Sequence, residues 1–196
     1  MRNQPTRGTG LLEPALARLR ARKANELIPD SKRSGRILDI GCGSNPYFLA
    51  HTYFREKYAI DRLPTGDIHP EIEWQVLDLN STPSIPYPDS YFDVITSLAV
   101  VEHLNPTRLV SLLQDTHRVL KPGGVLIITT PAAWTTRLLK ALSRINLVSQ
   151  EEIDEHEFQY TLPLLGWYLG ASNFELGKIR FGTFEFLMNL WAVAVK

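Results

Sequence analysis

Short apolar runs separated by longer segments are the feature that most constrains the fold of this chain. The runs are RILDI (36–40), YAI (58–60), WQVL (74–77), FDVITS (92–97) and VLIITT (125–130). Each is typical of a buried strand. Residues 106–120, between the last two runs, have helical spacing that begins after Asn105 as N-cap. We therefore predict an α/β fold, a doubly wound Rossmann-like sheet with helices on both faces and a ligand crevice at the carboxyl ends of the strands.

The end of the sequence predicts a reversal of chain direction. Residues 174–181 and 186–195 are strand-like, and their connection around Gly182 is too short for a parallel crossover. An antiparallel hairpin is therefore expected, which would make the sheet seven-stranded and mostly parallel with a reversed C-terminal strand. Before the sheet, residues 11–28 have helical spacing. Basic residues of this segment could meet an acidic substrate or a membrane surface, but we interpret them as a solvated helix face; they are Arg18, Arg20, Arg22 and Lys23.

The length of 196 residues is typical of one domain. Within residues 1–196 we expect four parts. They are an N-terminal helical segment (1–35), a cofactor-binding core (36–131), an acceptor-pocket or lid insertion (132–173) and a terminal β-hairpin (174–196).

The charge balance disfavours nucleic acid as a partner, because 21 Lys and Arg equal 21 Asp and Glu and give no positive field. Cys42 is the only cysteine, which excludes an internal disulfide and a cysteine metal cluster. The five histidines are scattered without metal-ligand spacing, so no metal is expected. We find no signal peptide and no apolar run long enough to span a membrane, and a cytoplasmic location is the natural expectation.

A glycine-rich turn follows the first predicted strand. In Asp39-Ile40-Gly41-Cys42-Gly43-Ser44-Asn45-Pro46 the glycines fall where a backbone must approach a ligand. Asn45 is expected to cap the next helix, with Pro46 at its first position and a helical pattern through residue 54. Tight turns between strand and helix also favour glycine for structural reasons, so this turn alone leaves function open.

Carboxylates follow the next two predicted strands. Asp61 lies 18 residues beyond Gly43, where it could accept both hydroxyls of a ribose. Asp78 follows the third strand in VLDL, where it could accept from the exocyclic amine of a purine. Acidic residues at successive strand ends favour a nucleoside-containing ligand.

From Arg36 to Pro131 the sequence resembles the class I S-adenosylmethionine-dependent methyltransferases. The branch in question methylates small molecules such as quinone precursors, sugars and secondary metabolites. The resemblance lies in RILDIGCGSNP, YAID, VLDL, IPYPDSYFDVITSLAVVEHL and RVLKPGGVLIITTP, which occur in this order. It implies methyl transfer from S-adenosylmethionine to a small-molecule acceptor, with S-adenosylhomocysteine as product.

The resemblance also implies roles for individual residues. Asp39, Gly41 and Gly43 would line the methionine portion and the ribose, and Asp61 would hold the ribose hydroxyls. Asp78 with Leu79 would contact the adenine, and Ser97 and Leu98 would border the methionine end. The sequence departs from the family at Asn45, where many members have a further glycine.

The acceptor side carries fewer signals. Our candidates for a general base are His103, His156 and Tyr160, and His103 with Glu102 could instead organise the loop after the fourth strand. Residues 134–148 form an amphipathic, basic pattern that could be a lid, a covering helix or a peripheral membrane contact.

Two other functions remain open. An NAD(P)-dependent oxidoreductase would share the glycine turn and Asp61, although Pro46 stands where its third glycine is expected. A catalytically silent member could bind the cofactor, or have lost it, and act through a partner.

Overall fold

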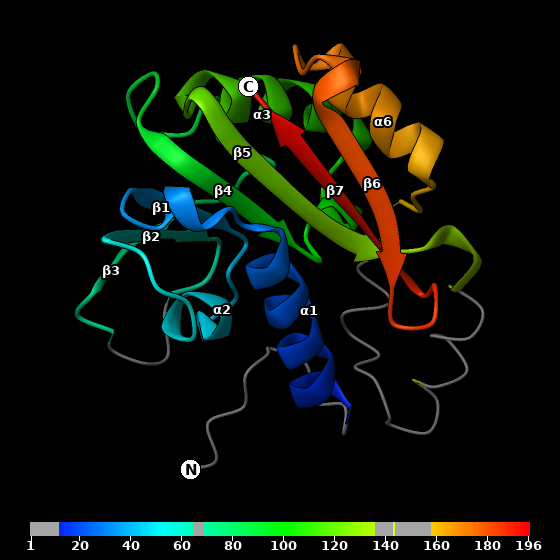
Figure 1. Cartoon of the computed structure of the whole chain (residues 1–196), viewed down its shortest axis with the longest axis horizontal. Helices are drawn as coiled ribbons and strands as arrows, with labels where there is room; N and C mark the ends of the chain where they lie inside the picture. Colours follow the sequence, from blue (N-terminus) through cyan, green and yellow to red (C-terminus); the bar gives the residue numbers. More distant parts are fainter. Residues whose placement is uncertain (1–11, 65–68, 136–142, 144–157) are drawn as a thin grey trace.

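A seven-stranded mixed sheet forms the centre of the computed structural model, which describes residues 12–64, 69–135, 143 and 158–196 (Figure 1). Its strands are β1 Arg36–Ile40, β2 Glu56–Asp61, β3 Ile72–Val76, β4 Phe92–Leu98, β5 Leu120–Pro131, β6 Ile179–Phe184 and β7 Asn189–Val195. The order is β3-β2-β1-β4-β5-β7-β6. Strand β7 runs antiparallel to both neighbours, whereas the other adjacent pairs are parallel. The predicted sheet with a reversed C-terminal strand is thus confirmed.

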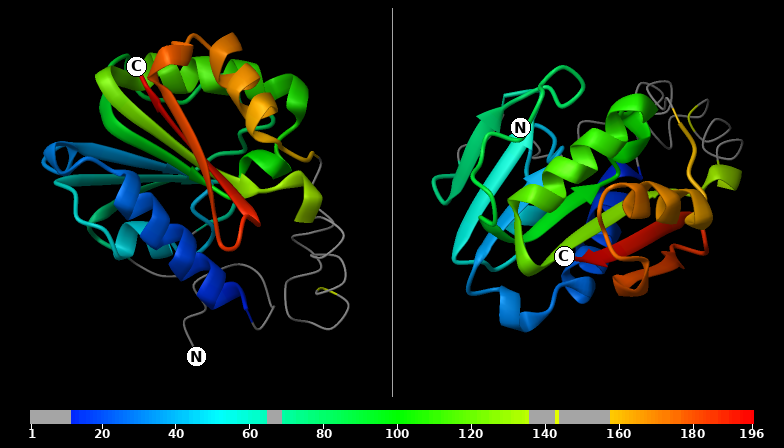
Figure 2. Two further views of the ribbon diagram at one scale, coloured as in Figure 1. Left: turned by 45° about the vertical axis from the view of Figure 1, so that its right-hand side comes forward. Right: turned by 90° about the horizontal axis from the view of Figure 1, so that it is seen from above.

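Helices cover both faces of the sheet, as predicted (Figure 2). The α-helices of the described residues are α1 Glu13–Leu27, α2 Tyr47–Ala50, α3 Pro106–Val119 and α6 Leu162–Ala171. Short 3-10 turns are η1 Asp30–Lys32, η2 Val101–His103, η3 Ala133–Thr135 and η4 Leu176–Lys178. No described helix is both long enough and apolar enough to cross a membrane.

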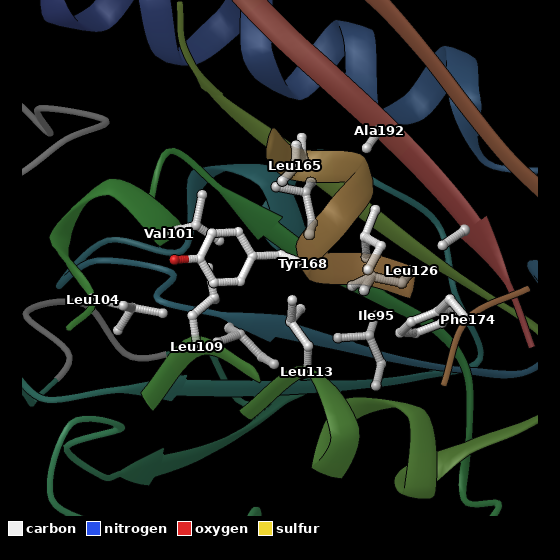
Figure 3. Packing of buried hydrophobic residues seen from close by; sticks show 14 of the residues in the cluster. Ile95, Val101, Leu104, Leu109, Leu113, Leu126, Leu165, Tyr168, Phe174 and Ala192 are labelled. Carbon is white, nitrogen blue, oxygen red and sulfur yellow. The ribbon is translucent and has the colours of Figure 1, made fainter. Parts of the chain in front are cut away.

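Alternating side chains of each strand supply the two cores. Ile37 and Val94 face α1 and α2, whereas Leu38 and Ile95 face α3 and α6, because successive side chains of a strand point to opposite faces. Figure 3 shows the second core, in which Tyr168 of α6 lies among leucines of α3 and Leu126 of β5. These buried faces fix the register of the parallel strands and hence the edge at which they end.

The terminal hairpin differs from the prediction in detail. Residues 174–178 are not strand, since Leu176–Lys178 forms a 3-10 turn. Gly182 is not the connection but lies inside β6, where an added Cβ would come within 2.4 Å of the Trp191 ring. The connection is residues 185–188, and Glu185, Phe186 and Leu187 all have positive φ.

The helix after the glycine turn is shorter and later than predicted. It begins at Tyr47, with Pro46 rather than Asn45 at the N-cap position, and it ends at Ala50. Thr52 Oγ1 donates to Asn25 Oδ1 (2.5 Å) at the end of α1 and accepts from Arg33 Nη1 (3.2 Å), which draws the chain away from the helix axis. The expected Asn105 cap of α3 is confirmed, because Asn105 Oδ1 accepts from the Thr107 amide at 2.9 Å.

Candidate active site

The glycine turn lies at the carboxyl end of β1 in a left-handed conformation. Gly41 and Gly43 have φ values of 72° and 70°, which L side chains rarely adopt. The Gly41 amide donates to the Ile60 carbonyl at 2.7 Å, and the Gly43 amide donates to Asp61 Oδ2 at 2.8 Å. Hydrogen bonds to β2 and its last residue therefore brace the turn.

The two glycines have different surroundings. A Cβ on Gly41 would lie 2.4 Å from Cγ2 of Val100, so packing against the loop after β4 excludes a side chain there. A Cβ on Gly43 would meet no atom within 4 Å. The space in front of Gly43 is open, and a ligand could approach its backbone closely.

Asp61 is the last residue of β2, and its carboxylate supports the glycine turn after β1. Its Oδ2 accepts from Gly43 and its Oδ1 accepts from the Leu63 amide at 2.9 Å. Each carboxylate oxygen has a second acceptor position. Asp61 could therefore accept from a ligand while it holds the turn in place.

Asp39 is a buried carboxyl group at the same strand end. Thr96 Oγ1 of β4 donates to Asp39 Oδ1 at 2.6 Å. Burial raises the pKa of Asp39 to about 7, with a further contribution from the charge of Asp61. Asp39 is consequently suited to bind a cationic group, because an ammonium would compensate its charge.

Asp78 and Leu79 follow β3 in a tight turn. Asp78 is exposed, and its carboxylate accepts from the Asn80 amide at 2.9 Å and the Ser81 hydroxyl at 3.2 Å. The Leu79 side chain is buried in the core beneath α3. Only Asp78 of this pair thus presents its side chain to solvent.

The end of β4 lies beside the glycine turn. Ser97 pairs with Ile40 in the parallel register, and it is buried, whereas Leu98 is partly exposed. Ala99 then takes φ of 57°, and its amide donates to the Thr129 carbonyl at 2.9 Å. This turn directs the following residue, Val100, onto Gly41.

The proposed general bases have unlike positions. His103 ends η2 and is partly buried. Tyr160 is fully buried, its hydroxyl donates to the Val101 carbonyl at 3.2 Å, and burial raises its pKa out of the range of a base at neutral pH. His156 lies outside the described residues, as does most of the predicted 134–148 segment. The geometry of Tyr160 favours a positioning role, in which it holds the 158–160 stretch against η2.

Cys42 does not have the environment of a reactive thiol. Its Sγ lies 3.6 Å from the Ile60 carbonyl, and burial raises the pKa of the thiol well above its usual value. Among the described residues, no group of three or more His, Cys, Asp or Glu side chains could hold a metal ion.

Sequence reasoning missed two residues that shape this edge. Thr96 holds Asp39, and Val100 packs on Gly41. Both depend on the pairing of β1 with β4, in which Asp39 lies opposite Thr96. A hydroxyl within an apolar strand is the one signal in the sequence that could have indicated Thr96.

Comparison with known proteins finds one recurring family. A family model described as a methyltransferase domain matches residues 12–178. The chain is 32% identical over 130 residues to 27-O-demethylrifamycin SV methyltransferase of Amycolatopsis mediterranei, covering 60% of this chain and 45% of that protein. It is 28% identical over 120 residues to a tRNA N(3)-cytidine methyltransferase of Mus musculus, covering 54% and 31%. Both matches span less than half of the relative.

A solved structure shares the fold over nearly the whole chain. It is an S-adenosylmethionine-dependent methyltransferase from Archaeoglobus fulgidus, with a TM-score of 0.64 at 20% identity over 93% of each chain.

Proposed function

Because the chain belongs to the S-adenosylmethionine-dependent methyltransferases, we propose that it moves a methyl group to a small-molecule acceptor at the carboxyl edge of β1, β2 and β4. The observation that carries the location is the open space in front of Gly43, in a backbone turn that the Asp61 carboxylate braces and that follows the buried carboxyl group of Asp39. A relationship to NAD(P)-dependent oxidoreductases, which the glycine turn alone left open, is superseded by the family match.

The donor half of the site fits S-adenosylmethionine by its chemistry. Asp39 would bind the ammonium of the methionine portion, and Asp61 would accept from the ribose hydroxyls. Gly41 and Gly43 would let the ligand approach the backbone, while Asp78 and the Leu79 backbone would meet the adenine. Ser97 and Leu98 would border the methionine end.

When bound, the cofactor supplies an electrophilic methyl group on a positively charged sulfur. Transfer of this methyl group to an acceptor oxygen, nitrogen or carbon would leave the electron pair of the broken bond on the sulfur of S-adenosylhomocysteine. The chain must align the acceptor and exclude water, and orientation of this kind provides most of the expected rate gain. His103 is our remaining described candidate to take a proton from an acceptor that must lose one.

We favour a small molecule over tRNA as the acceptor. The relatives include enzymes named for both kinds of substrate. This chain has equal numbers of basic and acidic residues, and the carboxylates of Asp39, Asp61 and Asp78 lie at the described site, which disfavours a polyanion.

A screen of acceptors with methyl-labelled S-adenosylmethionine tests the proposal. Phenols, quinone precursors and sugars form one arm, and unmodified tRNA forms the other. Label in a small molecule and none in tRNA is the expected result. Transfer to tRNA alone would contradict the acceptor class. Cofactor binding without transfer in either arm would favour a silent scaffold.

A further inference from the structure

Apolar side chains gather where the start of α1 meets the connection between β6 and β7. We call this group the tip surface, and its members are Leu16, Leu19, Phe184, Phe186, Leu187 and Met188. All but Leu187 line a shared groove of about 340 Å³ between the helix and the connection. Figures 1 and 2 show both elements beside each other, and Figure 1 shows that they extend past the sheet near the ends of β5 and β6.

The tip surface exposes side chains that a folded chain normally buries. Phe186 is 95% exposed, Leu187 is 62% exposed and Leu19 is 44% exposed. Single exposed apolar residues are ordinary, but adjacent ones around an apolar groove mark an interaction site.

The backbone beneath Phe186 is strained. Glu185, Phe186 and Leu187 have φ values of 53°, 55° and 69°, and none of them is glycine or asparagine. The Leu187 carbonyl is held by Trp134 Nε1 at 3.2 Å, and the Asn189 amide group donates to Glu185 Oε2 at 2.5 Å. These hydrogen bonds hold the strained backbone in place, and the result is that the Phe186 ring faces solvent. Backbone strain maintained in this way indicates a functional role.

Basic residues of α1 flank the tip surface, and the carboxylates of Glu26 and Glu185 also line its groove. Helix α1 carries four basic residues and two acidic ones, whereas the whole chain is neutral. Arg22 is exposed on the same side of the helix as Leu19, at a spacing of three residues, and the exposed Arg18 lies one turn before Arg22. Glu26 pairs with both Arg22 (3.1 Å) and Lys23 (2.8 Å), and the two acidic residues of α1 offset only two of its four basic ones.

We propose that the tip surface rests on an anionic lipid bilayer, with Phe186 and Leu187 entering the interface and Arg18 and Arg22 meeting the lipid phosphates. Apolar side chains flanked by cations are the composition that binds such interfaces. Trp134, which is 60% exposed beside Leu187, has an indole suited to the headgroup region. The contact differs from the predicted one through residues 134–148, because it is built from α1 and the β6–β7 connection.

The position of the tip surface relative to the methyl-transfer site has a consequence that rests on the proposed function. The β6–β7 connection lies at the same edge as the ends of β4 and β5, since β6 runs parallel to them. A bilayer at the tip surface would therefore face the edge at which the methyl group is transferred. An acceptor dissolved in the membrane could reach the site from that side.

Sedimentation of the full chain with vesicles tests the proposal without any methyl transfer. One vesicle preparation is phosphatidylcholine alone, and the other also contains phosphatidylglycerol. We expect binding to the anionic vesicles, much weaker binding to the neutral ones, and loss of binding at high salt. Binding to neither preparation overturns the proposal, whatever the outcome of the methyl-transfer assays. Equal binding to both overturns the role of the arginines.

Matched variants locate the contact. Phe186→Asn suits the left-handed backbone and removes the ring, and it should weaken vesicle binding roughly tenfold or more. Arg18→Gln and Arg22→Gln should each weaken it about fivefold. The controls Trp167→Gln, at a ring 61% exposed on α6, and Arg55→Gln, at the exposed residue just before β2, should bind like the parent. Unchanged binding of Phe186→Asn, or equal loss in the controls, overturns the assignment. The assignment is also overturned if the parent chain dimerises, Phe186→Asn abolishes the dimer, and no vesicle is bound.

Discussion

The two glycines of the turn after β1 have different roles, which depend on single residues at the carboxyl ends of the strands. Both were predicted from the turn after the first strand, and both have positive φ. Gly41 is required because Val100 occupies the space of a side chain, whereas Gly43 faces open space. Sequence alone could not separate them, since the difference depends on a residue from another strand end.

Alanine substitutions should separate the two roles. Gly41→Ala combines a left-handed alanine with a clash against Val100 and should destabilise the fold by about 2 to 5 kcal/mol. Gly43→Ala incurs only the left-handed penalty of about 1 to 2 kcal/mol, but it should weaken S-adenosylhomocysteine binding at least about tenfold, which is 1.4 kcal/mol. Thermal unfolding and calorimetric titration measure both effects. Equal melting temperatures for the two variants would show that Val100 does not exclude a side chain.

Asp39 predicts a pH dependence of stability. In the folded chain burial raises its pKa to about 7 from 3.8, so between these values the folded state holds a proton that the unfolded state has released. The stability contributed by this group is therefore greatest below about pH 4 and is lost as the pH rises to about 7. Asp39→Asn should remove this fall, and at pH 8 it should be more stable than the parent by on the order of a few kcal/mol.

Melting temperatures of parent and Asp39→Asn between pH 5 and 8 test this prediction. Curves that stay parallel would mean that Asp39 is ionised throughout. Affinity of the parent for S-adenosylhomocysteine should rise with pH over the same range, because the ionised carboxylate pairs with the ammonium of the ligand. The variant should lack this rise.

At the scale of elements, the centres of strands were easier to predict than their ends. Apolar runs located strands β1 to β5, because burial on both faces demands such residues. Helix α2 was expected to continue to residue 54, but Thr52 bonds to Asn25 instead. The β6–β7 connection contains no glycine, proline or asparagine between 185 and 188, so no local signal marked it.

The cap of α3 is an element whose prediction can be tested further. Asn105 Oδ1 accepts from both the amide (2.9 Å) and the hydroxyl (2.7 Å) of Thr107. Asn105→Ala should cost about 1 kcal/mol of stability, whereas Asn105→Asp should retain most of it. Denaturant titrations compare the two variants with the parent. Equal losses would assign the effect to the Asn105 backbone position rather than to its side-chain oxygen.

Tyr160 connects the 158–160 stretch to η2 through its bond to the Val101 carbonyl. Tyr160→Phe should lower stability by about 1 kcal/mol, the usual value of one buried hydrogen bond, and leave the pH profile of methyl transfer unchanged. The comparison needs an acceptor found in the screen. A loss of kcat beyond a hundredfold at unchanged cofactor affinity would instead make Tyr160 a catalytic base.

At the scale of the whole molecule, the donor half of the site followed from topology and the acceptor half did not. Parallel strands end at one edge, so residues predicted separately after β1, β2, β3 and β4 are brought to the same side of the sheet. Acceptor pockets are built from loops, and a fold supports many substrates. The neutral net charge of the chain argues against a strong general attraction to polyanions, but it says little else about the acceptor.

Calorimetric titration of the purified chain with S-adenosylhomocysteine and, separately, with NADH tests the central assignment most directly. We expect one S-adenosylhomocysteine site of micromolar affinity, weakened in Gly43→Ala, and no heat from NADH. Binding of NADH without binding of S-adenosylhomocysteine would contradict it.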